Sequence, residues 1–277
     1  MNDHTPTLEI NTKLATRILT DFIRTEVQRA GFERAVVGVS GGIDSALSCV
    51  LAAKALGPEN VLALFMPYAT TASESQHHAE QIINASGVQS ETLPITPMVD
   101  HLLADIPEEE KVRRGNIMAR MRMVVLFDRS ASIHGLVVGT GNKTEILLGY
   151  TTLYGDSACA INPIGDLYKT QVRQLARALE IPSEIIDKPP SADLWVGQTD
   201  EDELGFTYEE VDRLLVLMID GRYDLDACVA AGFKREFVKA VLDRIRRNQF
   251  KRLMPPIAKL SNRTIGYDFL YLRDWGT

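Results

Sequence analysis

The sequence predicts an α/β fold in which a doubly wound, mostly parallel sheet carries helices on both of its faces. Two observations predict it. Short runs of valine and leucine without polar alternation recur in the first half of the chain, as expected of strands that are covered on both faces. Segments of helical length separate these runs, and strands that alternate with helices form parallel sheets. The 277 residues suffice for one such domain, so we expect a single domain over residues 1–277.

The expected elements follow in chain order. Apolar residues recur at four-residue spacing from about residue 8 to 30, which predicts an amphipathic helix that ends at Gly31. The valine-rich run 35–39 predicts the first strand, and the segment 43–56, which Gly57-Pro58 terminates, predicts a helix. We further expect strands at 61–66, 91–95 and 136–139, a helix at 73–85, and two helical stretches between the last two strands.

The C-terminal part of the chain differs from the first half. From about residue 200 we expect helices only, at 208–219 and 233–248, followed by an irregular tail that contains Pro255-Pro256. In an open parallel sheet, ligands bind outside the carboxyl ends of the strands. We therefore expect the functional site in the loops that follow Val39 and Val138.

Composition and charge exclude several classes of function. Hydrophobic residues make up 45% and charged residues 24% of the chain, as in ordinary globular proteins. A net charge of -7 argues against a nucleic-acid partner, because phosphate binding needs clustered Lys and Arg. No apolar run is long enough for a transmembrane helix and the first residues do not resemble a signal peptide, so we expect no membrane partner and a cytoplasmic location. Cys49, Cys159 and Cys228 are too widely spaced for a disulfide framework or a CxxC site, and we expect them to be reduced.

The turn after the first strand carries the strongest chemical signal. It reads Gly38-Val39-Ser40-Gly41-Gly42-Ile43-Asp44-Ser45. A strand-to-helix turn presents free N–H groups and the positive end of the helix dipole, which favour an anion. The hydroxyls of Ser40 and Ser45 can donate to phosphate oxygens, whereas Asp44 would repel them unless a divalent cation lay between. This turn therefore predicts a polyphosphate with Mg²⁺; a glycine-rich turn without a ligand is the alternative. No lysine follows the glycines, so this is not a Walker A loop.

Ser40 to Ser45 resembles the pyrophosphate loop of the N-type ATP pyrophosphatases, whose fold is adenine nucleotide alpha hydrolase-like. Further stretches resemble the ammonia-dependent NAD synthetases in particular. They are Arg114–Met123, Gly139–Glu145, Tyr154–Asp156, Asn162–Thr170, Pro190–Trp195 and Asp200–Gly205. The resemblance covers nearly the whole chain. It is closest to the short members that use free ammonia, because no glutaminase motif surrounds any of the three cysteines.

The resemblance implies a reaction and a set of site residues. A carboxylate oxygen, that of deamido-NAD in this family, attacks the α-phosphate of ATP and releases pyrophosphate. Ammonia then displaces AMP to leave the amide, NAD. By position, Thr140 contacts the adenosine, and Glu145 joins Asp44 on Mg²⁺. Lys169 and Ser191 contact the phosphates. The family also forms homodimers that bind the dinucleotide at the subunit interface, which implies a homodimer here.

Three of the implied positions are catalytic. They are Asp44 and Lys169 at the phosphates and Asp156, which the resemblance places where ammonia or a bridging cation is positioned. Two carboxylates suit a hard cation, and a lysine can offset the charge that grows on the departing pyrophosphate. Glu145 and Lys169 could instead be solvated helix residues.

The resemblance fails at the second substrate. Where the family reads Lys-Tyr-Gly-Asp-Gly-Gly-x-Asp, this chain has Leu153 in place of the lysine and Ala160 in place of the last aspartate. Phe250 replaces the histidine of a His-Lys-Arg motif, while Arg120 and Lys251 are kept.

These departures leave alternatives open. A paralogue could amidate a more apolar carboxylate, and a divergent NAD synthetase could hold its dinucleotide by other residues. If Leu153, Ala160 and Phe250 line one apolar pocket near Arg120, the paralogue gains support; if they are scattered, it loses support. A non-catalytic ATP-binding module is the alternative from another class, and it would not require both candidate magnesium ligands and Lys169.

Overall fold

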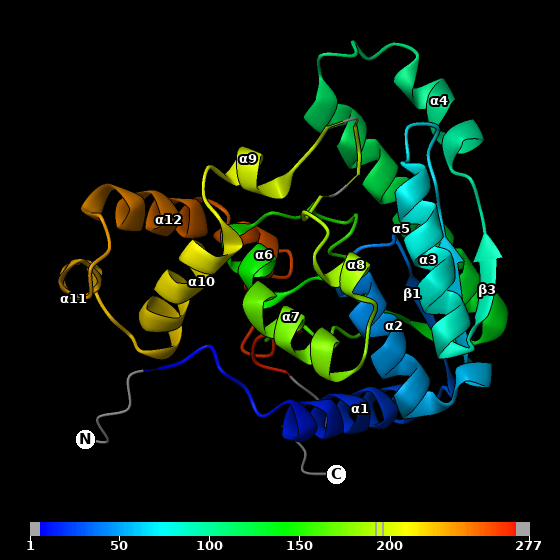
Figure 1. Cartoon of the computed structure of the whole chain (residues 1–277), viewed down its shortest axis with the longest axis horizontal. Helices are drawn as coiled ribbons and strands as arrows, with labels where there is room; N and C mark the ends of the chain where they lie inside the picture. Colours follow the sequence, from blue (N-terminus) through cyan, green and yellow to red (C-terminus); the bar gives the residue numbers. More distant parts are fainter. Residues whose placement is uncertain (1–5, 192, 196, 270–277) are drawn as a thin grey trace.

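The sheet of the computed structural model, which describes residues 6–191, 193–195 and 197–269, has four parallel strands (Figure 1). They are β1 (Arg34–Gly38), β2 (Val61–Phe65), β3 (Gln89–Thr92) and β4 (Gly135–Val138), in the order β3-β2-β1-β4. Val36 of β1 pairs with Leu62 of β2 and with Val137 of β4. The strand order reverses between β1 and β4, so the predicted α/β class is confirmed.

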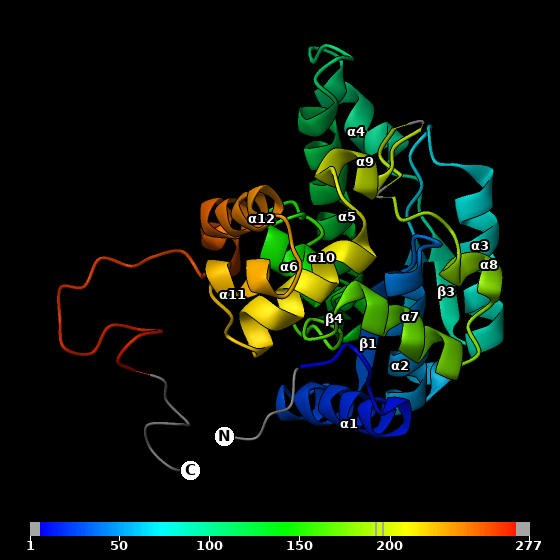
Figure 2. The same ribbon diagram turned by 60° about the vertical axis from the view of Figure 1, so that its left-hand side comes forward.

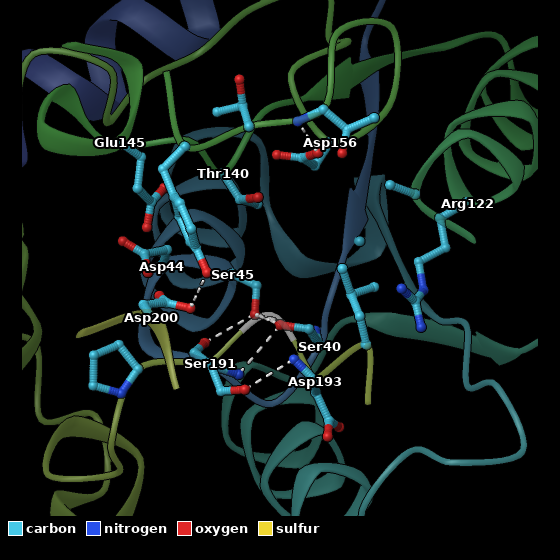
Figure 3. Close-up of a pocket in the computed structure, with 18 of the residues that line it drawn as sticks. Ser40, Asp44, Ser45, Arg122, Thr140, Glu145, Asp156, Ser191, Asp193 and Asp200 are labelled. Carbon is cyan, nitrogen blue, oxygen red and sulfur yellow. Dashed lines mark hydrogen bonds between the residues drawn. The ribbon is translucent and has the colours of Figure 1, made fainter. Parts of the chain in front are cut away.

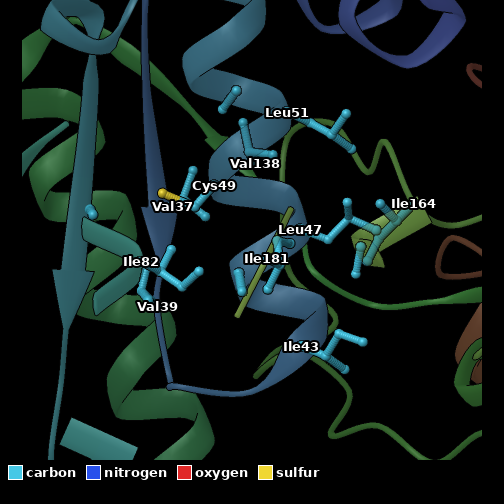
Figure 4. Close-up of a cluster of buried hydrophobic side chains, with 14 of the residues drawn as sticks. Val37, Val39, Ile43, Leu47, Cys49, Leu51, Ile82, Val138, Ile164 and Ile181 are labelled. Atoms are coloured by element: carbon cyan, nitrogen blue, oxygen red, sulfur yellow. The ribbon is translucent and has the colours of Figure 1, made fainter. Parts of the chain in front are cut away.

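Helices cover both faces of this sheet. One face carries α1 (Thr12–Arg29), α2 (Ile43–Leu56), α3 (Ser73–Ser86) and α7 (Lys169–Ala178), and the other carries α4 (Thr96–Leu103) and α5 (Lys111–Ile133). Successive residues of a strand point to opposite faces. Val37 accordingly packs with Leu47 of α2 in the first core (Figure 4), while Val36 packs with Val125 of α5 in the second.

The strand boundaries differ from expectation at one place. The strand expected at 91–95 is β3 at Gln89–Thr92, and all four of its residues are exposed. β3 lies at the edge of the sheet, where exposed polar side chains protect an unpaired edge. The apolar residues that suggested a strand instead form the connection to α4, in which Ile95 is fully buried. The helix expected from about residue 8 begins at Thr12, because the side chain of Asn11 accepts a hydrogen bond from the Leu14 N–H.

The C-terminal helices build a third core. They are α9 (Asp200–Leu204), α10 (Tyr208–Leu215), the π-helical turn Val216–Asp220, α11 (Leu225–Ala230) and α12 (Arg235–Arg247). They pack with α6 (Lys143–Leu148) around Tyr208, Val211 and Val238, all fully buried. The short helices α8 (Ser183–Ile186), Pro58–Asn60 and Gln249–Arg252 complete the elements.

The last described residues leave the body of the molecule as an extended segment (Figure 2). This is the irregular tail expected from the sequence, and its Leu260 is 96% exposed. Among the described residues, no helix is long and apolar enough to cross a membrane. The three cysteines are free thiols, as expected, with Cys49 and Cys228 buried.

Candidate active site

A cavity of about 590 Å³ opens at the carboxyl ends of β1 and β4, where the strand order reverses. It is lined by the loops after these two strands, by Lys169 at the start of α7, by residues 188–191, 193–195 and 198, and by one side of α5. The sequence predicted a ligand site after Val39 and Val138, and both residues lie in the wall of this cavity. In the stretch Pro190–Trp195, Ala192 lies outside the described residues.

The loop after β1 has a conformation that only glycine accommodates easily. Gly41 has a φ of +83°, and a Cβ atom placed on it would lie 2.2 Å from the carbonyl oxygen of Ser75. The Ser45 hydroxyl accepts from the Ser40 N–H at 3.1 Å and donates to the Gly42 carbonyl at 2.9 Å, which braces the loop from inside (Figure 3). Gly42, the N-cap of α2, has no side chain to cap the helix. The amides of the first turn of α2 therefore remain available to an anion.

A lysine and two carboxylates meet beside this loop. Nζ of Lys169 lies 2.5 Å from Oδ2 of Asp44 and 3.3 Å from Oε1 of Glu145. The side chains are 4%, 17% and 16% exposed respectively, so this cluster is largely removed from solvent. Asp44 is in the first turn of α2, Glu145 in α6 and Lys169 in α7. The fold thus brings together three residues that are distant in the sequence.

Asn142 holds the two carboxylates in place, a role that the sequence did not reveal. Its Nδ2 donates to Oδ1 of Asp44 at 2.9 Å. Its Oδ1 accepts from the Glu145 N–H at 3.0 Å, and the Glu145 side chain accepts from the Asn142 N–H, so the two residues form a capping box at the start of α6. The spacing of Asn142 and Glu145 is a signal from which the capping box could have been found. The bond to Asp44 had no local signal.

The electrostatics of the cluster favour the ammonium form of Lys169. Burial raises the pKa of Glu145 to about 8, although the charge of Lys169 opposes this shift. Burial by itself would lower the pKa of Lys169, but the carboxylates of Asp44 and Glu145 outweigh it and raise the pKa above its ordinary value. Lys169 is therefore a permanent cation that holds the side chains of Asp44 and Glu145 toward one point.

A third carboxylate, Asp200, faces the same cluster. It is 5% exposed and accepts hydrogen bonds from the hydroxyls of Tyr150 and Tyr208, both at 3.1 Å. Burial raises the pKa of Asp200, while the charge of Lys169 lowers it. The stretch Asp200–Gly205 contributed to the family resemblance, but its sequence gave no role for this particular carboxylate.

Asp212 anchors the start of α7 from the third core. It is fully buried; Thr144 Oγ1 donates to its Oδ1 at 2.5 Å and the Thr170 N–H donates to its Oδ2 at 2.8 Å. Thr144 Oγ1 also accepts from the Lys169 N–H at 3.0 Å. Through these bonds Asp212 positions the backbone that carries Lys169. No sequence spacing could have indicated a contact between residues 68 positions apart.

The other residues predicted for the ATP side line the same cavity. Thr140 and Ser191 face it from opposite sides of the loop that contains Ser40 and Ser45 (Figure 3). Asp156 also lines the cavity, where its Oδ1 accepts from the Thr152 N–H at 2.8 Å. Removal from solvent raises the pKa of the Asp156 carboxyl.

The residues predicted for the second substrate are not brought together in this way. Lys251 lines the cavity, and its Nζ donates to the carbonyl oxygens of Gly149 and Thr151, both at 2.7 Å. The other four predicted residues are not among the described residues that line the cavity. They are Arg120, Leu153, Ala160 and Phe250.

The three apolar replacements therefore do not contribute to the wall of this cavity. Phe250 is 58% exposed, and the carbonyl oxygen of Leu153 accepts from the Arg120 Nε at 3.3 Å. The α5 arginine that lines the cavity is Arg122, whose Nε donates to the Met66 carbonyl at 3.0 Å. The lining of this cavity therefore gives no support to a more apolar carboxylate.

Comparisons with known proteins match this chain over nearly its whole length. The family model described as NAD synthase matches residues 15–255. The NH(3)-dependent NAD(+) synthetase of Trichlorobacter lovleyi is 59% identical over 269 residues, which are 97% of this chain and 98% of that protein. Among solved structures, the NH3-dependent NAD synthetase of Campylobacter jejuni, in complex with the nitrate ion, has a TM-score of 0.77 at 32% identity and covers 90% of this chain and 100% of its own. The NMN synthetase of Francisella tularensis has a TM-score of 0.79 at 31% identity, with 91% and 100% covered.

Proposed function

This chain belongs to the NAD synthase family, and from that premise we propose how the residues of its cavity divide the reaction among them. The reaction is the ATP-dependent amidation of deamido-NAD with ammonia, so the protein is a carbon–nitrogen ligase. The observation that carries the proposal is the convergence of Asp44 and Glu145 on Lys169 beside the loop after β1. Neither a paralogue with another acid nor a non-catalytic module is favoured by relatives that are named NAD synthetases over nearly their full length.

The phosphates of ATP would occupy the loop from Gly38 to Ser45. The free amides at the start of α2 point toward this position, and the hydroxyls of Ser40 and Ser45 lie in the cavity wall. Ser191 would add a donor from the facing segment, and Thr140 would contact the adenosine from the loop after β4. Lys169 would neutralise charge that develops between the α-phosphate and the departing pyrophosphate.

The donor set fits Mg²⁺. The two carboxylates of Asp44 and Glu145 already lie within reach of one cation, because the ammonium of Lys169 contacts both. No group of three His, Cys, Asp or Glu side chains suited to a metal occurs among the described residues. One or two carboxylates completed by substrate phosphates and water are the usual ligands of Mg²⁺ in nucleotide sites. When bound there, the ion would neutralise phosphate charge and orient the polyphosphate.

We propose that the reaction proceeds in two steps. A carboxylate oxygen of deamido-NAD attacks the α-phosphorus of ATP. The bond between the α-phosphorus and the oxygen that bridges to the β-phosphorus breaks, and pyrophosphate leaves. The nitrogen of ammonia attacks the acyl carbon, AMP leaves with the electron pair of the broken C–O bond, and the nitrogen releases a proton. Asp156 lines the cavity and its raised pKa suits a carboxylate that orients ammonia and receives this proton.

The remaining second-substrate residues fit a shared site between two subunits. Arg120, Leu153, Ala160 and Phe250 lie outside the cavity of the single chain, and a homodimer would cover such outward positions. We therefore propose that the chain is a homodimer and that these residues meet deamido-NAD at its interface. A sedimentation measurement tests this: a monomer under assay conditions would contradict it.

A single domain over residues 1–277 and a cytoplasmic location also stay predictions.

The division of roles is tested by isotope exchange between pyrophosphate and ATP. With deamido-NAD present and ammonium absent, the first step runs alone, so we expect label to pass from pyrophosphate into ATP. Asp44→Asn should abolish this exchange, and Lys169→Met should slow it by about a hundredfold to a thousandfold. Asp21→Asn is the matched control, because Asp21 is exposed on α1 and forms a solvent-exposed ion pair with Arg24. Exchange at the wild-type rate in either site variant would overturn the assignment.

A further inference from the structure

Lys188 is a cation in the cavity wall to which the roles above assign nothing. It lines the cavity together with Ser40, Ser75 and Ser191. Its side chain is 18% exposed, and Nζ donates to Oγ of Ser75 at 2.9 Å. Lys188 comes from the segment after α8, whereas Lys169 begins α7, so the two lysines reach the cavity from different elements.

Ser75 connects Lys188 to the loop after β1. The carbonyl oxygen of Ser75 lies 2.2 Å from the position of a Cβ on Gly41, so the backbones of α3 and the loop are in close contact there. The ammonium of Lys188 therefore lies only one residue away from the loop that would hold the phosphates. Lys169 flanks the same loop through Asp44.

The charges of the two lysines are not equivalent. That of Lys169 is compensated by Asp44 and Glu145, which are both largely buried. Lys188 has Glu74 within ion-pair range, but the distance is 3.9 Å and the Glu74 side chain is 63% exposed, so water screens this pair. Lys188 is thus the lysine whose charge remains available to a ligand.

The start of α3 adds positive potential at the same place. This helix has 14 residues, and its N-cap is Ala72, which has no side chain to cap the first amides. Thr71 and Ser75 at this helix start line the cavity. The carboxylate there is Asp193, which accepts from the Ala72 N–H at 3.3 Å and is attracted by the charge of Arg122.

We propose that Lys188 and the first turn of α3 bind the β- and γ-phosphates of ATP and retain pyrophosphate after the first step. The cavity then has two ends of different charge. The acidic cluster around Lys169 suits a metal ion, and the end with Lys188 suits the terminal phosphates. The inference rests on the proposed function, in which the phosphates occupy the loop after β1. It assigns Lys188 a place in substrate binding that is separate from that of Lys169.

Calorimetric titration tests this proposal with three ligands: ATP, pyrophosphate and AMP, each with Mg²⁺. A charge-assisted hydrogen bond to phosphate is lost in Lys188→Met, so ATP and pyrophosphate should bind about tenfold to a hundredfold more weakly. AMP lacks the terminal phosphates and should bind as it does to the wild type. Lys188→Arg keeps the charge and should retain most of the affinity. Lys239→Met, on the exposed side of α12, is the matched control.

The outcomes separate this inference from the function on which it rests. Wild-type protein that binds neither ATP nor pyrophosphate would overturn both. Normal wild-type binding with unchanged pyrophosphate affinity in Lys188→Met would overturn the inference alone, as would an equal loss of AMP and pyrophosphate affinity. Thermal unfolding of each variant shows whether a loss of phosphate affinity is merely a failure to fold. Lys188→Gln, a second neutral substitution, should weaken pyrophosphate binding in the same way as Lys188→Met. In turnover assays, Lys188→Met should raise the KM for ATP and leave that for ammonium unchanged.

Discussion

The ammonium of Lys169 lies 2.5 Å from the carboxylate of Asp44, across 125 positions of sequence. This contact joins α7 to the phosphate loop and α2, and it places a permanent cation where a triphosphate would meet the protein. The same ammonium contacts Glu145, so one lysine organises both candidate magnesium ligands.

Lys169→Met should lower kcat by about a hundredfold to a thousandfold, the usual effect of removing one preorganised group that stabilises transition-state charge. It should also destabilise the fold, because Asp44, Glu145 and Asp200 would lose the cation that they surround. Steady-state kinetics and urea unfolding measure the two effects. Lys54→Met, at the exposed end of α2, is the control and should change neither quantity.

Glu145 should make the metal-free protein less stable as pH rises from about 4.5 to 8. Its pKa is raised from an ordinary value of 4.5 to about 8 by burial, so the folded state binds its proton more tightly than the unfolded state does. The stabilisation from this bound proton is complete below the pKa that Glu145 has in the unfolded state. It is lost as pH rises through the pKa of Glu145 in the folded state. When thermal unfolding is measured in a chelator, the unfolding temperature should fall less steeply with rising pH for Glu145→Gln than for the wild type. Equal slopes in both proteins would contradict this.

Gly41→Ala should abolish activity through a clash, whereas Gly31→Ala should not. Both glycines have nearly the same positive φ, +83° and +82°, so both substitutions incur a backbone strain of roughly 1 kcal/mol. A Cβ on Gly41 would meet the Ser75 carbonyl at 2.2 Å, while a Cβ on Gly31 would have nothing within 4 Å. Comparison of kcat and of unfolding free energies separates the clash from the strain. Equal effects in the two variants would exclude the close approach of α3 to the loop.

Asp212→Asn should lower the free energy of unfolding by about 1 to 3 kcal/mol, the cost of leaving a buried polar group without its partner. An amide group offers one acceptor in place of the two that receive the Thr144 hydroxyl and the Thr170 N–H. Because these bonds hold the start of α7, activity should fall as well. Asp226→Asn, which only breaks an exposed pair with Arg235, is the control for urea unfolding and kinetics. A fully active Asp212→Asn protein would show that Asp212 does not position Lys169.

Local sequence signals predicted much of the fold. The valine-rich run before Gly38, the loop and α2 were expected within one or two residues of their observed bounds, because their cues lie in adjacent residues. β3 was misplaced since its position depends on pairing with β2 and on its exposure at the sheet edge. Such tertiary context overrides the preference of Leu93 and Ile95 for a strand.

The candidate site was predictable where family motifs named its residues, and not where tertiary contacts define them. Asp44, Glu145 and Lys169 are in recognisable stretches, whereas the contact of Asp212 with α7 depends on how the third core packs. Arg120 and Arg122 lie about 200° apart around a helix, since successive helical residues are separated by roughly 100°. Only the packing of α5 on the sheet decides that Arg122 is the one that lines the cavity.

Product stoichiometry is the sharpest test of whether this protein amidates deamido-NAD at the expense of ATP. The protein is incubated with ATP, Mg²⁺, ammonium and deamido-NAD, and NAD, AMP and pyrophosphate are quantified together. We predict equimolar formation of the three products, with none formed when deamido-NAD is omitted. Folded, ATP-binding protein that forms no NAD, or that releases ADP and phosphate in place of AMP and pyrophosphate, would rule out amidation through an adenylate.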